Sequence, residues 1–260
     1  MTAIIAAMDE KYGIGLANTV PWHGTPAGTV DLRYFRRLTH GHILIMGYNT
    51  WLSINRRPLA GRINLVVSEA HYDDVCAQAR GLFNAEAMDE IELSHDQYCQ
   101  DRSKSPAPLH AFRSLDEAVA YACRLENLAE GHEPLVGFVI GGQRIYTEYL
   151  QHYTPSHAYL SIIPGDYDCD THFPVKLLRP NGTLHTENVK LESWPYADSI
   201  QFRHYIWQNR DEERYLEHSR LLVAKGVPKE ERTGVGTISY FSPPDLEFSL
   251  LDDVLPLLTK

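Results

Sequence analysis

The stretch Leu135-Val136-Gly137-Phe138-Val139-Ile140-Gly141-Gly142-Gln143-Arg144-Ile145-Tyr146 decides the fold. Its first six residues are an apolar run that is typical of a buried strand, and Gly141-Gly142 is a turn signal. Residues 143–150 are predicted to follow as a helix. A strand that passes through a glycine turn directly into a helix is the repeating unit of an α/β sheet.

Other parts of the chain repeat this arrangement. An apolar run over 42–46 ends at Gly47, and Asn49-Thr50-Trp51 is predicted to begin a helix. A helix is predicted to begin at Asp31, and another at Ser114, where Ser114 and Glu117 have capping-box spacing, with an end near Glu126. Further strands are predicted over 3–8, 63–67 and 157–163, with a late edge strand over 201–208. The alternation predicts an α/β fold whose central sheet is mostly parallel and is flanked by helices.

Two regions depart from this alternation. Residues 69–108 are polar and acidic without a sustained period, which predicts a surface insertion with one short helix. After residue 209 the chain changes character: an amphipathic helix is predicted over 212–225, followed by a polar, glycine-containing segment. We therefore place a domain boundary near residue 210, between a domain of residues 1–209 and a segment of residues 210–260.

Composition narrows the function classes. The 260 residues carry a formal net charge of -10, which argues against non-specific binding to nucleic acid or to anionic membranes but leaves an anionic ligand open. The four cysteines form no Cys-x-x-Cys pair, so neither a disulfide framework nor a metal site is expected. The apolar run over 3–8 has no basic segment before it, and no stretch is long enough for a membrane span. These features predict a soluble, cytoplasmic protein.

Two glycine turns are candidates for binding a phosphate. Gly47 and Gly141-Gly142 each follow a buried strand and open a predicted helix, so backbone N–H groups and the helix dipole can face an anion. One such turn alone often needs only a positive φ. The two together suggest a dinucleotide diphosphate held between two helix starts, although neither is a Gly-x-Gly-x-x-Gly fingerprint.

Asp31 is the candidate carboxylate. Taken alone, an Asp at a helix start is most simply a cap or a first-turn acid. The alternative is a carboxylate beside an aromatic-lined cleft, where partial burial would raise its pKa. Pro21-Trp22 before it and Phe35 one turn after it bring in the wider pattern.

Six ordered motifs over residues 1 to about 208, apart from the insertion, resemble dihydrofolate reductase. They are Gly13-Ile14-Gly15 with Asn18 and Pro21-Trp22; Asp31-Leu32-x-Tyr34-Phe35; Ile45-Met46-Gly47-x-x-Thr50-Trp51-x-Ser53-Ile54; Arg57-Pro58-Leu59-x-Gly61-Arg62-x-Asn64; Ile140-Gly141-Gly142-x-x-x-Tyr146; and Asp170-Thr171-x-Phe173-Pro174. The resemblance implies NADPH-dependent reduction of dihydrofolate to tetrahydrofolate by hydride transfer, in support of thymidylate and one-carbon metabolism.

The resemblance also assigns roles at the reacting end of the site. Asp31 matches the acid that hydrogen-bonds the pterin, Ser161 a hydroxyl that supports that contact, and Trp22 an aromatic in the mobile loop over the nicotinamide. Arg62 matches the residue that forks onto the α-carboxylate of the substrate's glutamate, a geometry that suits Arg. By pattern alone Arg62 would be a surface ion pair and the apolar positions simply core. The substrate-binding set implied is Ile5, Leu32, Phe35, Ile54, Leu59, Arg62, Ile140 and Tyr146.

The cofactor positions carry the family's pattern with departures. The set implied is Ala7, Ile14, Gly15, Asn18, Gly47, Tyr48, Asn49, Thr50, Ser68, Gly141, Gly142, Gln143, Arg144, Ile145 and Thr171, with a cis peptide bond between Gly141 and Gly142. Tyr48 and Asn49 stand where relatives commonly place a basic residue near the cofactor's 2′-phosphate, and Glu69 follows Ser68. Arg144 or Arg80 could compensate, so NADPH is expected and NADH stays open.

Residues 211–260 resemble the opening of thymidylate synthase, through Glu213-Arg214-Tyr215-Leu216, Gly226-Val227, Lys229 to Thr237 and Pro256 to Lys260. The Pro-Cys-His setting of the nucleophile is absent from this sequence, so no synthase activity is expected, and Arg232 has no completed phosphate site. We expect an incomplete synthase segment, either a fragment of a fused reductase–synthase or a shortened copy.

Three alternatives are compatible with the same sequence. One is a related pyrimidine- or flavin-pathway reductase with the same fold, and another is a non-catalytic module that assembles with a thymidylate synthase. A third is an insertion that blocks the cofactor groove. The expected partners are dihydrofolate and antifolate inhibitors, with a synthase partner or a homodimer through the C-terminal segment left open.

Overall fold

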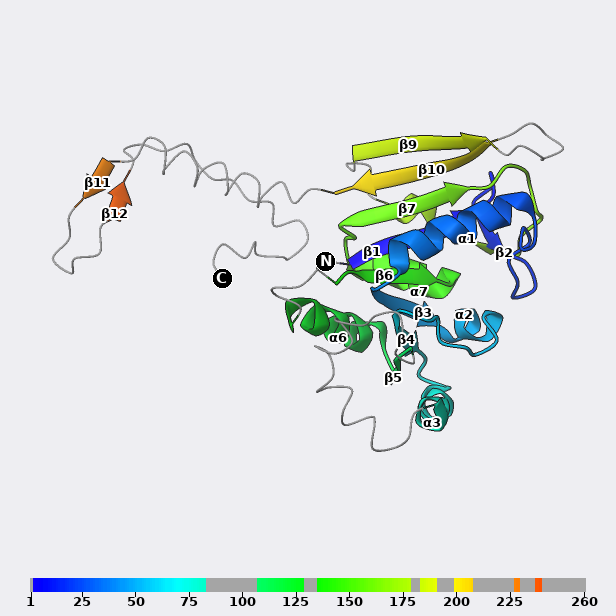
Figure 1. Cartoon of the computed structure of the whole chain (residues 1–260), viewed down its shortest axis with the longest axis horizontal. Coiled ribbons are helices and arrows are strands. Elements are labelled where there is room, and N and C mark those ends of the chain that lie inside the picture. Colours follow the sequence, from blue (N-terminus) through cyan, green and yellow to red (C-terminus); the bar gives the residue numbers. More distant parts are fainter. Residues whose placement is uncertain are drawn as a thin grey trace. The chain divides into compact units, whose positions relative to one another are not determined.

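The core of the protein is an eight-stranded sheet in a computed structural model, which describes residues 2–82, 107–128, 135–178, 183–190, 199–207, 227–229 and 237–239. The strand order is β5-β4-β3-β6-β1-β7-β10-β9 (Figure 1). Neighbouring strands from β5 to β7 run parallel, and β10 and β9 are antiparallel to their neighbours. The strands are β1 Thr2–Met8, β3 Ile43–Gly47, β4 Ile63–Val67, β5 Leu109–Phe112, β6 Gly137–Gly141, β7 His157–Ile162, β9 Thr183–Lys190 and β10 Ser199–Ile206. The expected α/β fold with a mostly parallel sheet is confirmed.

Helices cover both faces of this sheet, because successive side chains of a strand point to opposite sides. In β1, Ile4 packs with α6 and α7 residues, whereas Ile5 packs on the other side with residues of α1, α2 and α3. Figure 1 shows α1 lying across the sheet, on the side to which Ile5 points. The helices are α1 Pro26–Thr39, α2 Tyr48–Ser53, α3 Tyr72–Leu82, α6 Leu115–Leu128 and α7 Gln143–His152, with a 3-10 turn, η1, at Val175–Leu177.

The helix starts follow local chemistry. Thr25 caps α1: its hydroxyl accepts a hydrogen bond from the Gly28 N–H at 3.1 Å and donates to the Trp22 carbonyl at 2.7 Å. Pro26 stands at the first helical position, where its missing N–H costs nothing. At α6 the predicted capping box is present, since the Glu117 N–H donates to Ser114 Oγ at 3.2 Å and the Ser114 N–H donates to Glu117 Oε2 at 3.4 Å.

One predicted helix start was wrong, and another differs by a single residue. Asp31 does not begin a helix: α1 begins five residues earlier, so Asp31 lies in its second turn. The glycine at position 28 hid this first turn from the periodicity, while the Thr25-Pro26 cap was the signal for it. The helix predicted from Asn49 begins one residue earlier, at Tyr48.

Two predicted surface regions also differ from expectation. The region taken as an insertion from residue 69 contains α3, in line with the short helix expected there, but α3 packs on the domain: its Gln78 side chain accepts a hydrogen bond from the Trp51 indole at 3.0 Å. Its far end runs into β5, which pairs with β4 and was not predicted. Residues 83–106 lie outside the described part. The strand predicted over 201–208 as an edge is β10, which is flanked by β7 and by the unpredicted β9.

Two pairs of short strands lie outside the eight-stranded sheet. β2 (Gly13–Gly15) pairs with β8 (Thr171–His172), and β11 (Val227–Lys229) pairs with β12 (Thr237–Ser239) where a polar segment was expected. The chain divides into two compact units, residues 1–207 and 208–260. The helix predicted over 212–225, most of the synthase-like motif residues and Arg232 lie outside the described residues.

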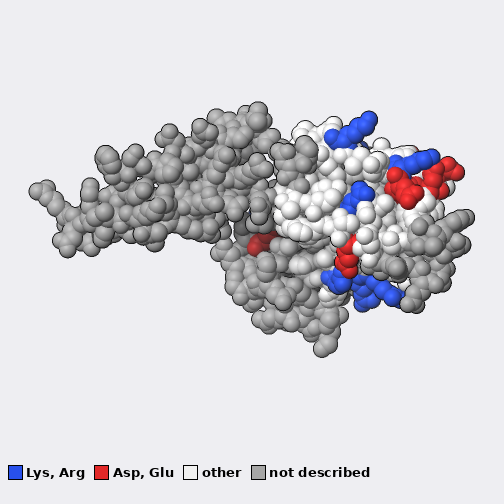
Figure 2. Space-filling view, turned by 90° about the horizontal axis from the view of Figure 1, so that it is seen from above, with Lys and Arg blue, Asp and Glu red and all other residues white. Residues whose placement is uncertain are grey.

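The following features concern surface charge, the length of the helices and the grouping of side chains that could hold a metal ion. On the face shown in Figure 2, basic and acidic groups mostly adjoin one another instead of forming separate fields. Of the helices described, none combines the length and the apolar character needed to cross a membrane. Within the same residues, no group of three or more His, Cys, Asp or Glu side chains is placed to hold a metal ion.

Candidate active site

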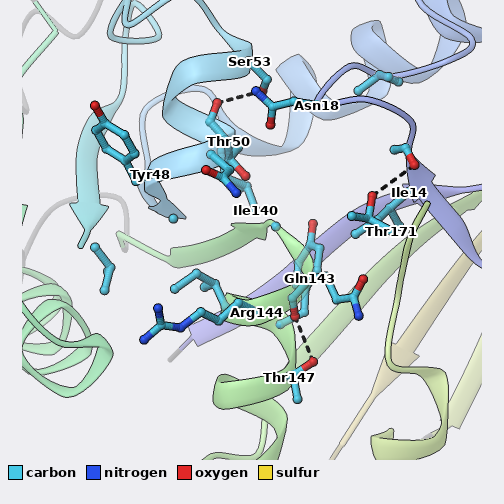
Figure 3. Close-up of a pocket in the computed structure, with 18 of the residues that line it drawn as sticks. Ile14, Asn18, Tyr48, Thr50, Ser53, Ile140, Gln143, Arg144, Thr147 and Thr171 are labelled. Atoms are coloured by element: carbon cyan, nitrogen blue, oxygen red, sulfur yellow. Dashed lines mark hydrogen bonds between the residues drawn. The ribbon is translucent and has the colours of Figure 1, made fainter. Parts of the chain in front are cut away.

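A cavity of about 1340 Å³ opens at the carboxyl ends of the parallel strands. Gly47 at the end of β3, Val67 at the end of β4 and Ile140 in β6 all line it, which is the usual place for a ligand in an α/β sheet. Most of the predicted site residues line this cavity, and Figure 3 shows ten of its residues labelled. The predicted residues that line it are Ala7, Ile14, Gly15, Asn18, Trp22, Asp31, Leu32, Gly47, Tyr48, Asn49, Thr50, Ser68, Ile140, Gly142, Gln143, Arg144, Ile145, Tyr146 and Thr171.

Asp31 is the carboxylate of this cavity. Helix α1 carries it, and the buried Ser161 hydroxyl of β7 donates a hydrogen bond to it. Removal of the carboxyl group from water raises its pKa to about 6, and the Ser161 hydrogen bond opposes that rise. Ser161 therefore meets Asp31 as expected, and the raised pKa makes Asp31 able to exchange a proton near neutral pH.

Trp22 lines the cavity on the same side and is 1% exposed. Its ring packs edge-on against Tyr167 at a centroid distance of 5.4 Å. Its buried indole N–H finds no acceptor among the described residues. Because an unmet buried donor is costly, this N–H is available to a ligand or a water in the cavity.

The part of the cavity at the start of α7 fits a phosphate. The N-terminus of α7 has no side-chain cap, and Gly142, Gln143 and Arg144 at that end line the cavity, so the first N–H groups of the helix can meet an anion. Gly47 lies against α7 so closely that a Cβ there would be 2.9 Å from Ile145 Cγ1. The bond between Gly141 and Gly142 is cis, as the resemblance implied.

Two loops are fastened together over the cavity. The Gly15 carbonyl accepts hydrogen bonds from the Asp170 N–H at 3.0 Å and from the Thr171 hydroxyl at 3.1 Å, the second of which Figure 3 shows. The Asp170 carboxylate accepts from the Ala17 N–H at 2.8 Å. These bonds hold Ile14 and Asn18 at one end of the cavity, away from Tyr48 and Arg144 (Figure 3).

Seven predicted site residues do not line the cavity. Phe35, Ile54 and Leu59 are partly buried and pack against the core cluster on the α1 side of the sheet, and the Arg62 guanidinium lies over the Phe35 ring at 5.8 Å. This cluster places Arg62 beside the predicted apolar wall and leaves it 7% exposed. The other three are Ser161 behind Asp31, Gly141 before the helix turn, and Ile5, whose carbonyl accepts a hydrogen bond from the Tyr146 hydroxyl at 2.8 Å.

Some lining residues were not predicted. Thr19, Val20 and His23 come from the loop between β2 and α1, and Gly28 from the first turn of α1. His71 follows β4 in a segment that the sequence assigned to the insertion, and Arg113 and Ser114 follow β5, where the sequence predicted only a helix cap at Ser114. The missed β5 explains the last two, since this strand brings Arg113 to the carboxyl edge of the sheet. Arg80, in contrast, does not line the cavity.

Comparison with known proteins agrees with this geometry. Residues 1–104 match the family model for dihydrofolate reductase. The bifunctional dihydrofolate reductase-thymidylate synthases of Paramecium tetraurelia and Crithidia fasciculata are 27% and 29% identical, each over 99% of this chain, which covers 47% and 49% of them. The dihydrofolate reductase of Pneumocystis carinii is 27% identical over 74% of this chain and 84% of its own length.

The chain thus spans about half the length of the bifunctional relatives. Among solved structures, dihydrofolate reductase from Enterococcus faecalis, complexed with NADP(H) and RAB-propyl, superposes with a TM-score of 0.51 at 19% identity. It covers 79% of this chain, and 95% of that structure is matched. The architecture of the described sheet and helices is therefore the dihydrofolate reductase fold.

Proposed function

We propose that this chain reduces 7,8-dihydrofolate to 5,6,7,8-tetrahydrofolate with NADPH. The observation that carries the proposal is Asp31, a desolvated carboxyl group braced by Ser161, in the same cavity as the uncapped start of α7. The match of residues 1–104 to dihydrofolate reductase and the names of the relatives support it.

Asp31 would bind the pterin ring. A carboxylate accepts two parallel hydrogen bonds from an amino group and a neighbouring ring N–H, which fixes the ring's orientation. Because its pKa is about 6, Asp31 holds or releases a proton near neutral pH and so favours the protonated form of the reacting ring nitrogen. Trp22 would add its free indole N–H to the same ligand or to a water beside it.

Other residues would hold the ends of the two ligands. Arg62, placed over Phe35, would fork onto the carboxylate of the substrate's glutamate. The Gly142 turn and the start of α7 would bind the cofactor's diphosphate, and the linked loops at Gly15 and Thr171 would cover its nicotinamide and exclude water. A bound reduced nicotinamide would supply a hydride to the pterin carbon beside the protonated nitrogen.

The bifunctional relatives also support the expectation that residues 211–260 correspond to the start of a thymidylate synthase. We infer that the reductase chemistry belongs to residues 1–207, the unit that holds the whole cavity described above. No synthase turnover is expected from this chain, and a synthase partner or a second copy of the chain would engage residues beyond 207.

The test is dihydrofolate-dependent oxidation of NADPH by the purified chain and by Asp31→Asn. The native chain should turn over and should be inhibited by methotrexate. Asp31→Asn should lose at least about 100-fold in kcat at pH 7, because general acid–base groups contribute on that scale. Its affinity for NADPH should stay unchanged, since the cofactor contacts lie elsewhere. Turnover in Asp31→Asn close to that of the native chain would overturn the role of Asp31.

A further inference from the structure

The end of the cavity remote from Asp31 has a distinct charge arrangement, and the inference drawn from it rests on the proposed function. Tyr48, Ser68, Glu69, His71 and Arg113 line it, each just beyond the carboxyl end of β3, β4 or β5. With a nicotinamide beside Asp31 and a diphosphate at the start of α7, the adenosine half of a bound dinucleotide would extend toward these residues, which lie beyond the strands farthest from β7 in this part of the sheet.

The arginines at this end already have acidic partners. Arg113 pairs with Asp73 at 3.7 Å and lies over the Tyr72 ring at 4.1 Å. On the α7 side, Arg144 pairs with Glu148 at 3.9 Å. A 2′-phosphate would therefore have to compete with a carboxylate for each guanidinium.

The Tyr48 hydroxyl also has polar partners. Its hydroxyl donates to the Asp74 carboxylate at 2.7 Å and accepts from Arg56 at 3.1 Å, while Arg56 pairs with Asp74 at 3.6 Å. The Tyr48 ring stacks on His71 at a centroid distance of 4.0 Å. Tyr48 thus presents a flat aromatic wall to the cavity and sequesters the nearby Arg56.

Glu69 is the exception. Within the described residues no hydrogen bond or ion pair involves its carboxylate, although it lines the cavity two residues after the end of β4. An acid beyond a strand end in a dinucleotide site accepts hydrogen bonds from ribose hydroxyls, whereas an arginine there accommodates a 2′-phosphate. A carboxylate facing a phosphate also meets like-charge repulsion.

We propose that Glu69 is a specificity-determining residue that admits the unphosphorylated adenosine ribose, so that this pocket separates NADPH from NADH by no more than about tenfold. Glu69 accepts hydrogen bonds from the ribose hydroxyls of NADH and repels the extra phosphate of NADPH. The paired arginines recover part of the attraction for that phosphate, which keeps both cofactors usable.

The test compares binding of two probes, adenosine 2′,5′-bisphosphate and 5′-AMP, and of NADPH and NADH, to the full chain by calorimetry. The variant is Glu69→Gln, and the matched control is Glu10→Gln, which removes the same charge from an exposed residue outside this cavity. In Glu69→Gln the ratio of affinities should shift about fivefold toward the 2′-phosphorylated ligand, and the shift should shrink at high salt. Glu10→Gln should leave the ratio unchanged.

Two results overturn the inference while the proposed function stands: a native chain that prefers NADPH by more than about tenfold, or a Glu69→Gln ratio equal to the native one. A chain that binds neither dinucleotide would instead overturn the proposed function, and the inference with it. The ratio kcat/KM(NADPH) to kcat/KM(NADH) in native chain and variant should follow the binding ratios.

Discussion

At the scale of residues, the central group is the Asp31 carboxyl. Its place in the site was predicted, but the contacts that surround it could not all be predicted from the sequence. Asp31 and Trp22 were identified through the ordered motifs and Ser161 through the resemblance they carry, and the Asp31–Ser161 hydrogen bond is present. Their separation in sequence hides the contact, because it exists only once α1 lies over β7. The desolvation that raises the pKa of Asp31 likewise comes from packing and could not be read from residue types.

The raised pKa of Asp31 also predicts how the free energy of unfolding depends on pH. Its pKa is about 6 in the folded chain and near 3.8 in the unfolded chain, so the folded state holds more protons between those values. The contribution of Asp31 to stability should therefore fall as pH rises from about 4 to about 6, and the loss persists above that range. Asp31→Asn should remove this loss and stabilise the chain at pH 8 by up to about 3 kcal/mol. Denaturant unfolding at pH 8 and at pH 4 measures it; an equal effect at both pH values would contradict the prediction.

At the scale of elements, the sequence was most reliable for buried apolar runs and for the glycine turns between a strand and a helix. The strand over 63–67 and the turn at Gly141-Gly142 were located correctly. The errors fell on elements whose stability comes from pairing. β5 and β9 have no strong alternation of their own, and each is formed by hydrogen bonds to a neighbouring strand. The missed β5 also hid Arg113 as a residue of the cavity.

The cap of α1 links an element to the site. Thr25→Ala removes the hydroxyl that accepts from Gly28 and donates to Trp22, so the chain should lose about 1 kcal/mol of unfolding free energy. Because α1 carries Asp31 and the same hydroxyl holds the Trp22 carbonyl, KM for dihydrofolate should rise with it. Thr25→Ser keeps the hydroxyl and serves as the control. A Thr25→Ala chain as stable as Thr25→Ser would show that the cap is not used.

His110 in β5 predicts a second pH dependence of the free energy of unfolding. Burial lowers the pKa of His110 to about 4, so the unfolded chain binds more protons than the folded chain between pH 4 and 6.5. His110 should therefore make the chain lose about 2–3 kcal/mol of stability as the pH falls through that window. His110→Gln should remove this contribution, so in urea unfolding the variant should gain stability relative to the native chain at pH 4.5 compared with pH 7. A difference between variant and native chain that is the same at both pH values would contradict the lowered pKa of His110.

At the scale of the whole molecule, residues 1–207 form one compact unit that holds the entire cavity. The expected boundary near residue 210 came from a change in composition, which marks where one core ends but does not reveal the fold of the next segment. A chain ending at Trp207 should keep the native melting temperature within a few degrees and the native affinity for NADPH. A large fall in both would show that residues after 207 are needed for the reductase unit.

The most direct test of the central claim is transfer of the hydride itself. Dihydrofolate is incubated with the chain and with NADPH carrying two deuterium atoms at C4 of the nicotinamide, and the folate product is analysed by mass spectrometry. Reduction at the cavity of Asp31 predicts tetrahydrofolate that contains one deuterium, formed by the native chain and in a much smaller amount by Asp31→Asn. Unlabelled tetrahydrofolate, or no tetrahydrofolate from a chain that binds both ligands, would contradict the account.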